Sequence, residues 1–177
     1  LVARCGALRL RIERKSRAIV IERADSGEEI LTQVDAQCGR EGSMARFLAR
    51  PGEDWVGFGD QTRDRLYHRG HVCDLHVRNV NSYIPVPFFM STRGYGVLID
   101  TTHRVRCDMA ASDVERFDWR SGSPQIDYYV MVGRDFRELL GLYTDLTGKP
   151  TLPPEWAFGL WYICRTQAND FEAVNDA

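Results

Sequence analysis

The sequence has little lysine, no paired cysteine motif and no long apolar run. Lys15 and Lys149 are the only lysines among 23 basic residues, and the formal net charge is −2. A chain with no excess of positive charge has no general basic face, which argues against nucleic acid as a partner. No apolar stretch approaches the roughly 20 residues of a membrane-spanning helix, so no membrane partner is expected.

The five cysteines are odd in number and include no C-x-x-C pair. Reduced, mostly buried thiols in a reducing compartment are the simplest interpretation, which favours a cytoplasmic location. The cluster with metal-ligating residue types is His68, His71, Cys73 and His76. Its spacing matches no standard zinc pattern and crosses a predicted strand and loop. We therefore expect neither a metal nor a cofactor.

Short strand-like runs dominate residues 1–132. Leu8 to Ile12 alternates like a half-buried strand, and Arg17 to Arg23 is β-branched at its centre. Residues 36–46 are small and polar and are predicted to form a loop. Further strands are predicted at Pro87–Ser91, Gly96–Thr101, Arg104–Met109 and Asp127–Val132, with a tight hairpin at Arg93-Gly94. The regular spacing predicts a mainly β fold, an antiparallel β-sandwich.

The hydrophobic period changes after Gly133 and predicts one helix of about 13 residues. Apolar residues then recur at helical spacing, and Gly148 and Pro150 end the pattern. They are Phe136, Leu139, Leu140 and Tyr143.

Two prolines mark a stiff connector after this helix. Pro153 and Pro154 exclude helix and restrict the residue before them. The nearly unbroken apolar run from Trp156 to Cys164 then resembles a buried parallel strand, and a helix is predicted to begin near Asn169. The expected organisation is a sandwich domain over residues 1–148, followed over residues 149–177 by a linker and the incomplete start of a second domain.

Several segments in a fixed order resemble a known family. They are Gly57-Phe58-Gly59-Asp60, Tyr83 to Ser91, Arg93-Gly94-Tyr95-Gly96-Val97, Asp127 to Gly133, and Leu139 to Trp161 with its LTGKP and LPPEW sequences. Together they resemble glycoside hydrolase family 31, the α-glucosidase and α-xylosidase family. The first fifty residues carry no such motif. The segment Gly57-Phe58-Gly59 lacks the later glycine and the helix of a dinucleotide-binding loop, and is predicted to be a turn.

This resemblance implies both a fold and a function. In the family, an N-terminal galactose-mutarotase-like sandwich packs on a catalytic (β/α)8 barrel, so Trp156 to Arg165 would form the first strand of a truncated barrel. A complete barrel needs about 250 residues. The nucleophile and the acid/base carboxylate of a retaining α-glycoside hydrolase are therefore expected outside this chain. The chain alone is expected to be inactive, with the barrel as its missing partner and an α-glycoside as the substrate of the intact enzyme.

The resemblance also implies a substrate-binding loop before the second quoted segment. At Asp74 to Ser82 the family has a loop that reaches the active site and often carries an N-R-D sequence. The nearest equivalents here are Arg78 and Asn79. The Asn79 amide can both donate to and accept from sugar hydroxyls. An ordinary solvated loop is the alternative interpretation.

A second candidate region lies at the end of the predicted first barrel strand. Arg165 and Thr166 stand at its carboxyl end, where barrel enzymes build their sites. Arg165 could bind an anionic substituent or form an ion pair at the barrel rim. The family usually has an aromatic residue near Thr166, which suggests a different substrate preference. Trp161 could stack on a sugar ring or fill the barrel core.

Two other functions are compatible with a sandwich of this type. A non-catalytic carbohydrate-binding module is the second hypothesis, although such a module has no use for the Pro153-Pro154 junction and its apolar strand. A mutarotase-type epimerase would need a histidine acid facing a carboxylate base, whereas the histidines at 68, 71 and 76 cluster around one loop. The sequence carries no signal for an oligomeric state.

Overall fold

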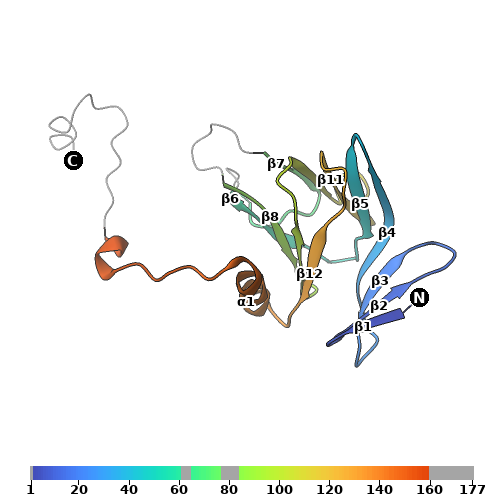
Figure 1. Cartoon of the computed structure of the whole chain (residues 1–177), viewed down its shortest axis with the longest axis horizontal. Coiled ribbons are helices and arrows are strands. Elements are labelled where there is room, and N and C mark those ends of the chain that lie inside the picture. Colours follow the sequence, from blue (N-terminus) through green and yellow to red (C-terminus); the bar gives the residue numbers. More distant parts are fainter. Residues whose placement is uncertain (1, 61–64, 77–83, 160–177) are drawn as a thin grey trace. The chain divides into compact units, whose positions relative to one another are not determined.

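The computed structural model describes residues 2–60, 65–76 and 84–159, which form two antiparallel sheets, one α-helix and one turn of 3-10 helix. The chain divides into two compact units, Leu1–Leu146 and Thr147–Ala177. The first unit contains both sheets (Figure 1). The antiparallel sandwich predicted from the sequence is thus confirmed.

The larger sheet has eight strands, with the N-terminal strands at one edge and β7 at the other. Its strand order is β1-β2-β3-β4-β5-β11-β10-β7. The strand bounds are β1 (Val2–Cys5), β2 (Leu8–Ile12), β3 (Ile19–Arg23), β4 (Glu29–Gly39), β5 (Gly42–Leu48), β7 (His71–Leu75), β10 (Val105–Met109) and β11 (Arg116–Ser121). Strands predicted at Leu8 to Ile12, within Arg17 to Arg23 and within Arg104 to Met109 are confirmed.

The smaller sheet has four strands in the order β12-β9-β8-β6. The bounds are β6 (Trp55–Asp60), β8 (Ile84–Ser91), β9 (Tyr95–Ile99) and β12 (Tyr128–Val132). The predicted hairpin at Arg93-Gly94 joins β8 to β9, and the Gly94 N–H donates to the Ser91 carbonyl at 3.0 Å. Gly94 has φ +80, which explains a glycine at this turn.

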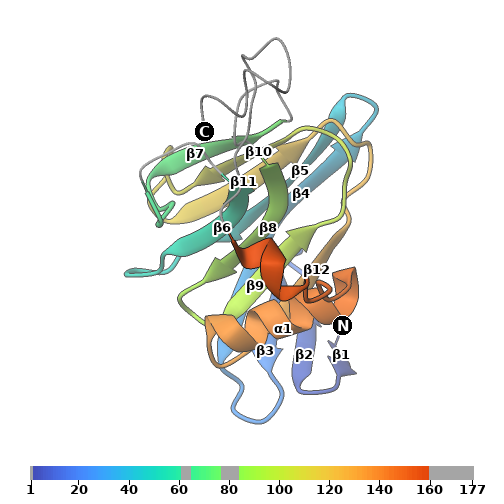
Figure 2. The same cartoon turned by 90° about the vertical axis from the view of Figure 1, so that its left-hand side faces the viewer.

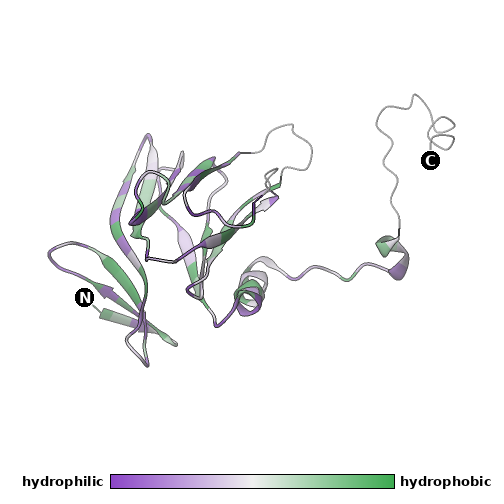
Figure 3. Cartoon of the chain, turned by 180° about the vertical axis from the view of Figure 1, so that it is seen from behind, coloured by the Kyte–Doolittle hydropathy of each residue, from purple (hydrophilic) through white to green (hydrophobic). Residues whose placement is uncertain are grey.

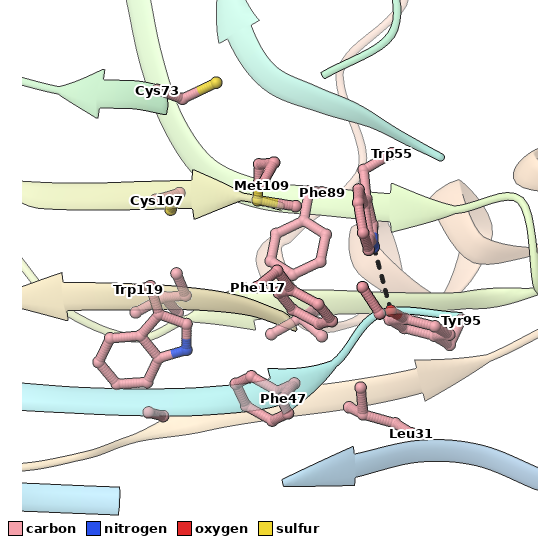
Figure 4. Packing of buried hydrophobic residues seen from close by; sticks show 14 of the residues in the cluster. Leu31, Phe47, Trp55, Cys73, Phe89, Tyr95, Cys107, Met109, Phe117 and Trp119 are labelled. Atoms are coloured by element: carbon pink, nitrogen blue, oxygen red, sulfur yellow. Dashed lines mark hydrogen bonds between the residues drawn. The ribbon is translucent and has the colours of Figure 1, made fainter. Parts of the chain in front are cut away.

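Large aromatic side chains fill the space between the sheets (Figure 4). Phe47 of β5 stacks on Phe117 of β11, with ring centroids 5.0 Å apart. Trp55, Tyr95 and Trp119 are at most 1% exposed and belong to this core. Buried residues alternate with less buried ones along β5, because successive side chains of a strand point to opposite faces.

Helix α1 (Phe136–Thr147) covers the other face of the smaller sheet (Figure 2). Asp135 Oδ1 accepts a hydrogen bond from the Glu138 N–H at 2.8 Å, which caps the start of the helix. Gly148 follows its last residue with φ +101. Leu139 is fully buried against the sheet, and Tyr143 stacks on Phe88 at 4.3 Å. The predicted helix is confirmed, and the second half of β8, from Phe88 to Ser91, is buried on both of its faces.

Residues 36–46 are not a loop, contrary to the prediction. They form the facing ends of β4 and β5, paired in register from Ala36↔Ala45 to Gly39↔Gly42. The tip of this hairpin is polar and exposed (Figure 3), whereas Ser43 and Ala45 of β5 are buried. In this range the β4 residues are exposed and the buried positions of β5 carry small side chains, so the hydrophobic pattern did not detect these strand ends.

The predicted turn at Gly57-Phe58-Gly59 is also wrong, because these residues lie inside β6. Their φ angles are +130, +67 and +76, and the pairing with β8 shifts register between Gly57 and Gly59. The segment is therefore a bulge in a strand. A bulge and a tight turn share the need for positive φ, and the sequence pattern does not separate them.

In the second unit, Glu155–Phe158 forms one turn of 3-10 helix. The Ala157 N–H donates to the Pro154 carbonyl at 2.9 Å, and the Gly159 N–H to the Trp156 carbonyl at 3.1 Å. Trp156 to Phe158 are therefore not the extended start of a strand, because local bonds satisfy their backbone. The rest of the predicted strand and the helix predicted near Asn169 lie outside the described residues. Within the described part of the chain, no helix has the length and apolarity to cross a membrane.

One buried and one partly buried tyrosine make stability sensitive to alkaline pH. Burial raises the pKa of Tyr128 to about 12. Burial, then the charge of Glu53, raises the pKa of Tyr95 well above its usual value. Unfolded tyrosines ionise near pH 10. Above about pH 10 the unfolded state therefore binds fewer protons than the folded state, and the free energy of unfolding should decrease as pH rises toward 12.

Urea unfolding at several pH values between about 9 and 12 measures this decrease. The variant Tyr128→Phe should show a shallower decrease than the parent chain, because one titrating group is removed. An equally steep decrease in both proteins would contradict the assignment.

Candidate functional site

The candidate site is the end of the sandwich where β7 stops at Leu75 and β8 starts at Ile84. These strands flank residues 77–83, in which two substrate-binding residues are predicted. A cleft of about 310 Å³ lies at this end. It is lined by the end of β7, by Pro85 and Pro87 of β8, and by residues 101–105 between β9 and β10.

The bulge in β6 fixes the first residues of β8 at this end of the sandwich. Gly59 pairs with Pro85, and a Cβ atom on Gly59 would lie 2.1 Å from the Ile84 carbonyl oxygen. Only glycine permits this approach, since Gly59 also has φ +76. The glycines of the Gly57-Phe58-Gly59-Asp60 segment thus hold the strand that leads out of residues 77–83.

An ion pair ties the β9–β10 connection to β7. Arg104 Nε donates to Asp74 Oδ1 at 2.7 Å, and Arg104 Nη2 donates to Asp74 Oδ2. The Arg104 side chain is 53% exposed, so the pair contributes at most about 1 kcal/mol to stability. Its main effect is to orient the polar rim of the cleft. The Asp74 carboxylate is engaged in this pair.

Hydroxyl and imidazole groups form the remaining polar rim. Thr101 Oγ1 accepts from the His103 backbone N–H at 3.1 Å and lies 3.4 Å from His103 Nδ1. It also lies 3.5 Å from Ser121 Oγ. Such groups both donate and accept hydrogen bonds, which suits the hydroxyls of a neutral polyol better than a fixed charge.

A buried carboxylate anchors the β8–β9 hairpin, and no sequence signal indicated it. Glu53 is 2% exposed. Its Oε1 accepts from the Ser91 and Tyr95 hydroxyls, both at 2.6 Å, and its Oε2 accepts from the Arg50 N–H at 2.9 Å. The Trp55 indole N–H donates to the Tyr95 hydroxyl at 3.1 Å (Figure 4). This network is structural, because its members bind one another and none of them lines the cleft.

The histidine and cysteine cluster is only partly assembled. His68 Nδ1 lies 3.4 Å from Cys73 Sγ, and His68 Nε2 lies 3.3 Å from the Gly57 carbonyl oxygen. Among residues 2–60, 65–76 and 84–159, no group of three or more His, Cys, Asp or Glu side chains could hold a metal ion.

The predicted substrate-binding residues lie outside the described residues. Arg78 and Asn79 fall within residues 77–83, and Trp161, Arg165 and Thr166 fall within residues 160–177. Their roles stay predictions. The described structure includes the two strands that precede and follow residues 77–83, β7 and β8, and the cleft at their ends.

The chain is similar to enzymes that act on α-linked sugars. An isomaltosyltransferase from Sporosarcina globispora is 30% identical over 126 residues, which cover 65% of this chain and 11% of that protein. The α-xylosidase XylQ from Lactiplantibacillus pentosus is 40% identical over 80 residues, 45% of this chain and 10% of that protein. This chain thus spans about a tenth of the length of these curated relatives.

A solved structure supports the same placement. The cycloalternan-forming enzyme from Listeria monocytogenes, in complex with a pentasaccharide substrate, matches with a TM-score of 0.81 at 26% identity. The match covers 90% of this chain and 17% of that chain. The family model described as the glycosyl hydrolase 31 N-terminal galactose mutarotase-like domain matches residues 4–108, and the sandwich seen here is the fold it describes. The chain therefore belongs to glycoside hydrolase family 31, as the N-terminal galactose mutarotase-like domain of that family.

Proposed function

We propose that the chain serves as the N-terminal sandwich of a retaining α-glycoside hydrolase that cleaves O-glycosyl bonds of α-linked glucosides, xylosides or related sugars. The family match over residues 4–108 carries the proposal. By name, two relatives are an isomaltosyltransferase and an α-xylosidase, and the matched region makes up about a tenth of each of them. The catalytic carboxylates would lie on a barrel outside residues 1–177.

The proposed domain boundary is at residue 148, with residues 149–177 as the linker and the start of the barrel. The division of the chain between Leu146 and Thr147 supports this boundary. In the intact enzyme, Asn79 and Arg78 would contact the substrate from the loop beside the cleft. Arg165 and Thr166 would contact it from the end of the predicted first barrel strand, and Trp161 from within that strand.

A chimera tests the proposed role directly. This chain would replace the matching N-terminal segment of the α-xylosidase XylQ, to which it is 40% identical over 80 residues. We expect the chimera to hydrolyse an aryl α-xyloside, and XylQ with the segment deleted to lose activity. A folded chimera without activity would contradict the support role.

The chain by itself is expected to release no nitrophenol from aryl α-glucosides or α-xylosides. A retaining glycosidase needs two carboxyl groups about 5 to 5.5 Å apart. Hydrolysis above the blank would place this pair within residues 1–177 and contradict the proposal. Calorimetric titration with maltose and isomaltose tests the alternative, a carbohydrate-binding module, for which millimolar or tighter binding is the expected result.

A further inference from the structure

Two cysteines face each other across the last two strands of the larger sheet. Cys73 of β7 and Cys107 of β10 are direct partners in the antiparallel ladder. Directly opposed residues have Cα atoms about 4.5 or 5.5 Å apart, and both side chains point to the same face. Both separations fall within the range of about 4.4 to 6.8 Å that disulfides span. The ladder pairing therefore places the two Cα atoms within the range that a disulfide can span.

His68 is positioned to accept the proton of Cys73. A carbonyl oxygen can only accept, so the contact of His68 Nε2 with the Gly57 carbonyl at 3.3 Å places the ring proton on Nε2. The neutral ring then presents the Nδ1 lone pair to Cys73 Sγ at 3.4 Å. The Phe58 ring packs against the imidazole at 5.1 Å and helps to hold it in this orientation.

Cys107 has a different environment from Cys73. It is fully buried, and burial raises the pKa of its thiol well above the usual value, with further contributions from Cys73 and Asp118. It therefore stays a thiol at neutral pH. One cysteine of the pair therefore has a proton acceptor beside it, and the other is a neutral thiol directly opposite. This is the arrangement of an attacking and a resolving cysteine.

We propose that Cys73 and Cys107 form a reversible cross-strand disulfide on reaction with a peroxide, with His68 as the base. Cys73 passes its proton to His68 Nδ1, and the thiolate attacks one peroxide oxygen while the O–O bond breaks. The departing hydroxide takes the proton from His68 and leaves as water, and Cys73 becomes a sulfenic acid. Cys107 sulfur then attacks Cys73 sulfur, the S–O bond breaks, and a second water carries away the hydroxyl group and the Cys107 proton. Two thiols are oxidised and one hydrogen peroxide is reduced to two waters.

The place of the pair in the fold supplies a route for a small oxidant. Cys73 is 1% exposed and Cys107 is 0% exposed. However, β7 lies at the edge of the larger sheet, with β10 as its ladder partner in the described structure. A five-residue edge strand opens locally at lower cost than a central strand. The disulfide would then fasten β7 to β10 beside residues 77–83. This inference does not depend on glycosidase activity.

The test treats the folded full chain with hydrogen peroxide and then blocks remaining thiols with N-ethylmaleimide in denaturant. Digestion and mass spectrometry should find one peptide linked through Cys73 and Cys107, lighter by two hydrogen atoms and released by dithiothreitol. Exposed Cys38 is the internal control for peroxide exposure. If Cys38 is oxidised while Cys73 and Cys107 both stay alkylated as thiols, the proposal is wrong.

Two variants separate the steps. Cys107→Ser should stop the reaction at a Cys73 sulfenic acid, which dimedone traps. His68→Gln should slow disulfide formation by about a hundredfold or more, since the base is lost. Circular dichroism checks that both variants are folded, and a folded His68→Gln that oxidises at the parent rate overturns the role of His68. A crosslink that forms only in urea overturns the folded-state geometry.

Discussion

Gly59→Ala is expected to lower the free energy of unfolding by about 4 kcal/mol, whereas Gly27→Ala should lower it by about 1 kcal/mol. The two glycines have nearly the same φ angle, +76 and +72. An added Cβ would lie 2.1 Å from the Ile84 carbonyl oxygen and 2.8 Å from the Val86 nitrogen at Gly59, but meets nothing within 4 Å at Gly27. The difference between the variants therefore measures the close approach of β6 to β8.

Urea denaturation of both variants provides the measurement, with the midpoint and the slope fitted separately. Equal losses at the two positions would show that positive φ alone sets the requirement for glycine, and the steric argument would fail. In the chimera with XylQ, Gly59→Ala should also reduce α-xylosidase activity, because β8 leads directly out of residues 77–83. Gly27→Ala is the matched control for activity.

Glu53→Ala should lower the free energy of unfolding by a similar amount, about 4 kcal/mol, because three buried donors lose their acceptor. These donors are the hydroxyls of Ser91 and Tyr95 and the backbone N–H of Arg50. Each hydrogen bond to a charged group contributes about 1.5 to 3 kcal/mol, and a partly additive sum gives the expected loss. Guanidinium denaturation followed by tryptophan fluorescence measures it, since Trp55 belongs to the same network.

Two further variants control the Glu53 result. Glu41→Ala removes an exposed glutamate at the tip of the β4–β5 hairpin and should change the free energy of unfolding by no more than about 0.5 kcal/mol. Glu53→Gln should lower the free energy of unfolding by about 2 kcal/mol. The amide oxygen can still accept hydrogen bonds, but the amide N–H group then faces a donor and that hydrogen bond is lost. A Glu53→Ala variant as stable as Glu41→Ala would refute the network as a source of stability.

Alternating and helical hydrophobic patterns predicted much of this fold, and the failures have two causes. Strand β8, β9, β12 and helix α1 follow their sequence signals. Strand β11 was missed although Phe117 and Trp119 alternate with Arg116, Asp118 and Arg120, a clear signal for a half-buried strand. The ends of β4 and β5 carried no such signal, because β4 is exposed there and the start of β5 is defined by its backbone pairing with β4 on one side and β11 on the other.

The site was less accessible to sequence reasoning than the fold. The motif resemblance located the Gly57 to Asp60 segment, but its bulge exists because β8 approaches β6 closely, which is a tertiary fact. Glu53 is a charged residue next to a turn, and nothing local predicts that such a side chain is buried. Its three donors come from β8, β9 and the turn before it, so the network appears only once the strands are assembled.

The position of α1 dictates how the chain could be shortened for crystallisation. Ending it at Gly133 would strip the helix away and uncover Val56, Phe88, Met90 and Met131, which now lie beneath it. An exposed apolar sheet face of this kind promotes precipitation when a protein is concentrated. The shortest soluble truncation must therefore extend at least to Thr147. A version that ends earlier should aggregate rather than crystallise.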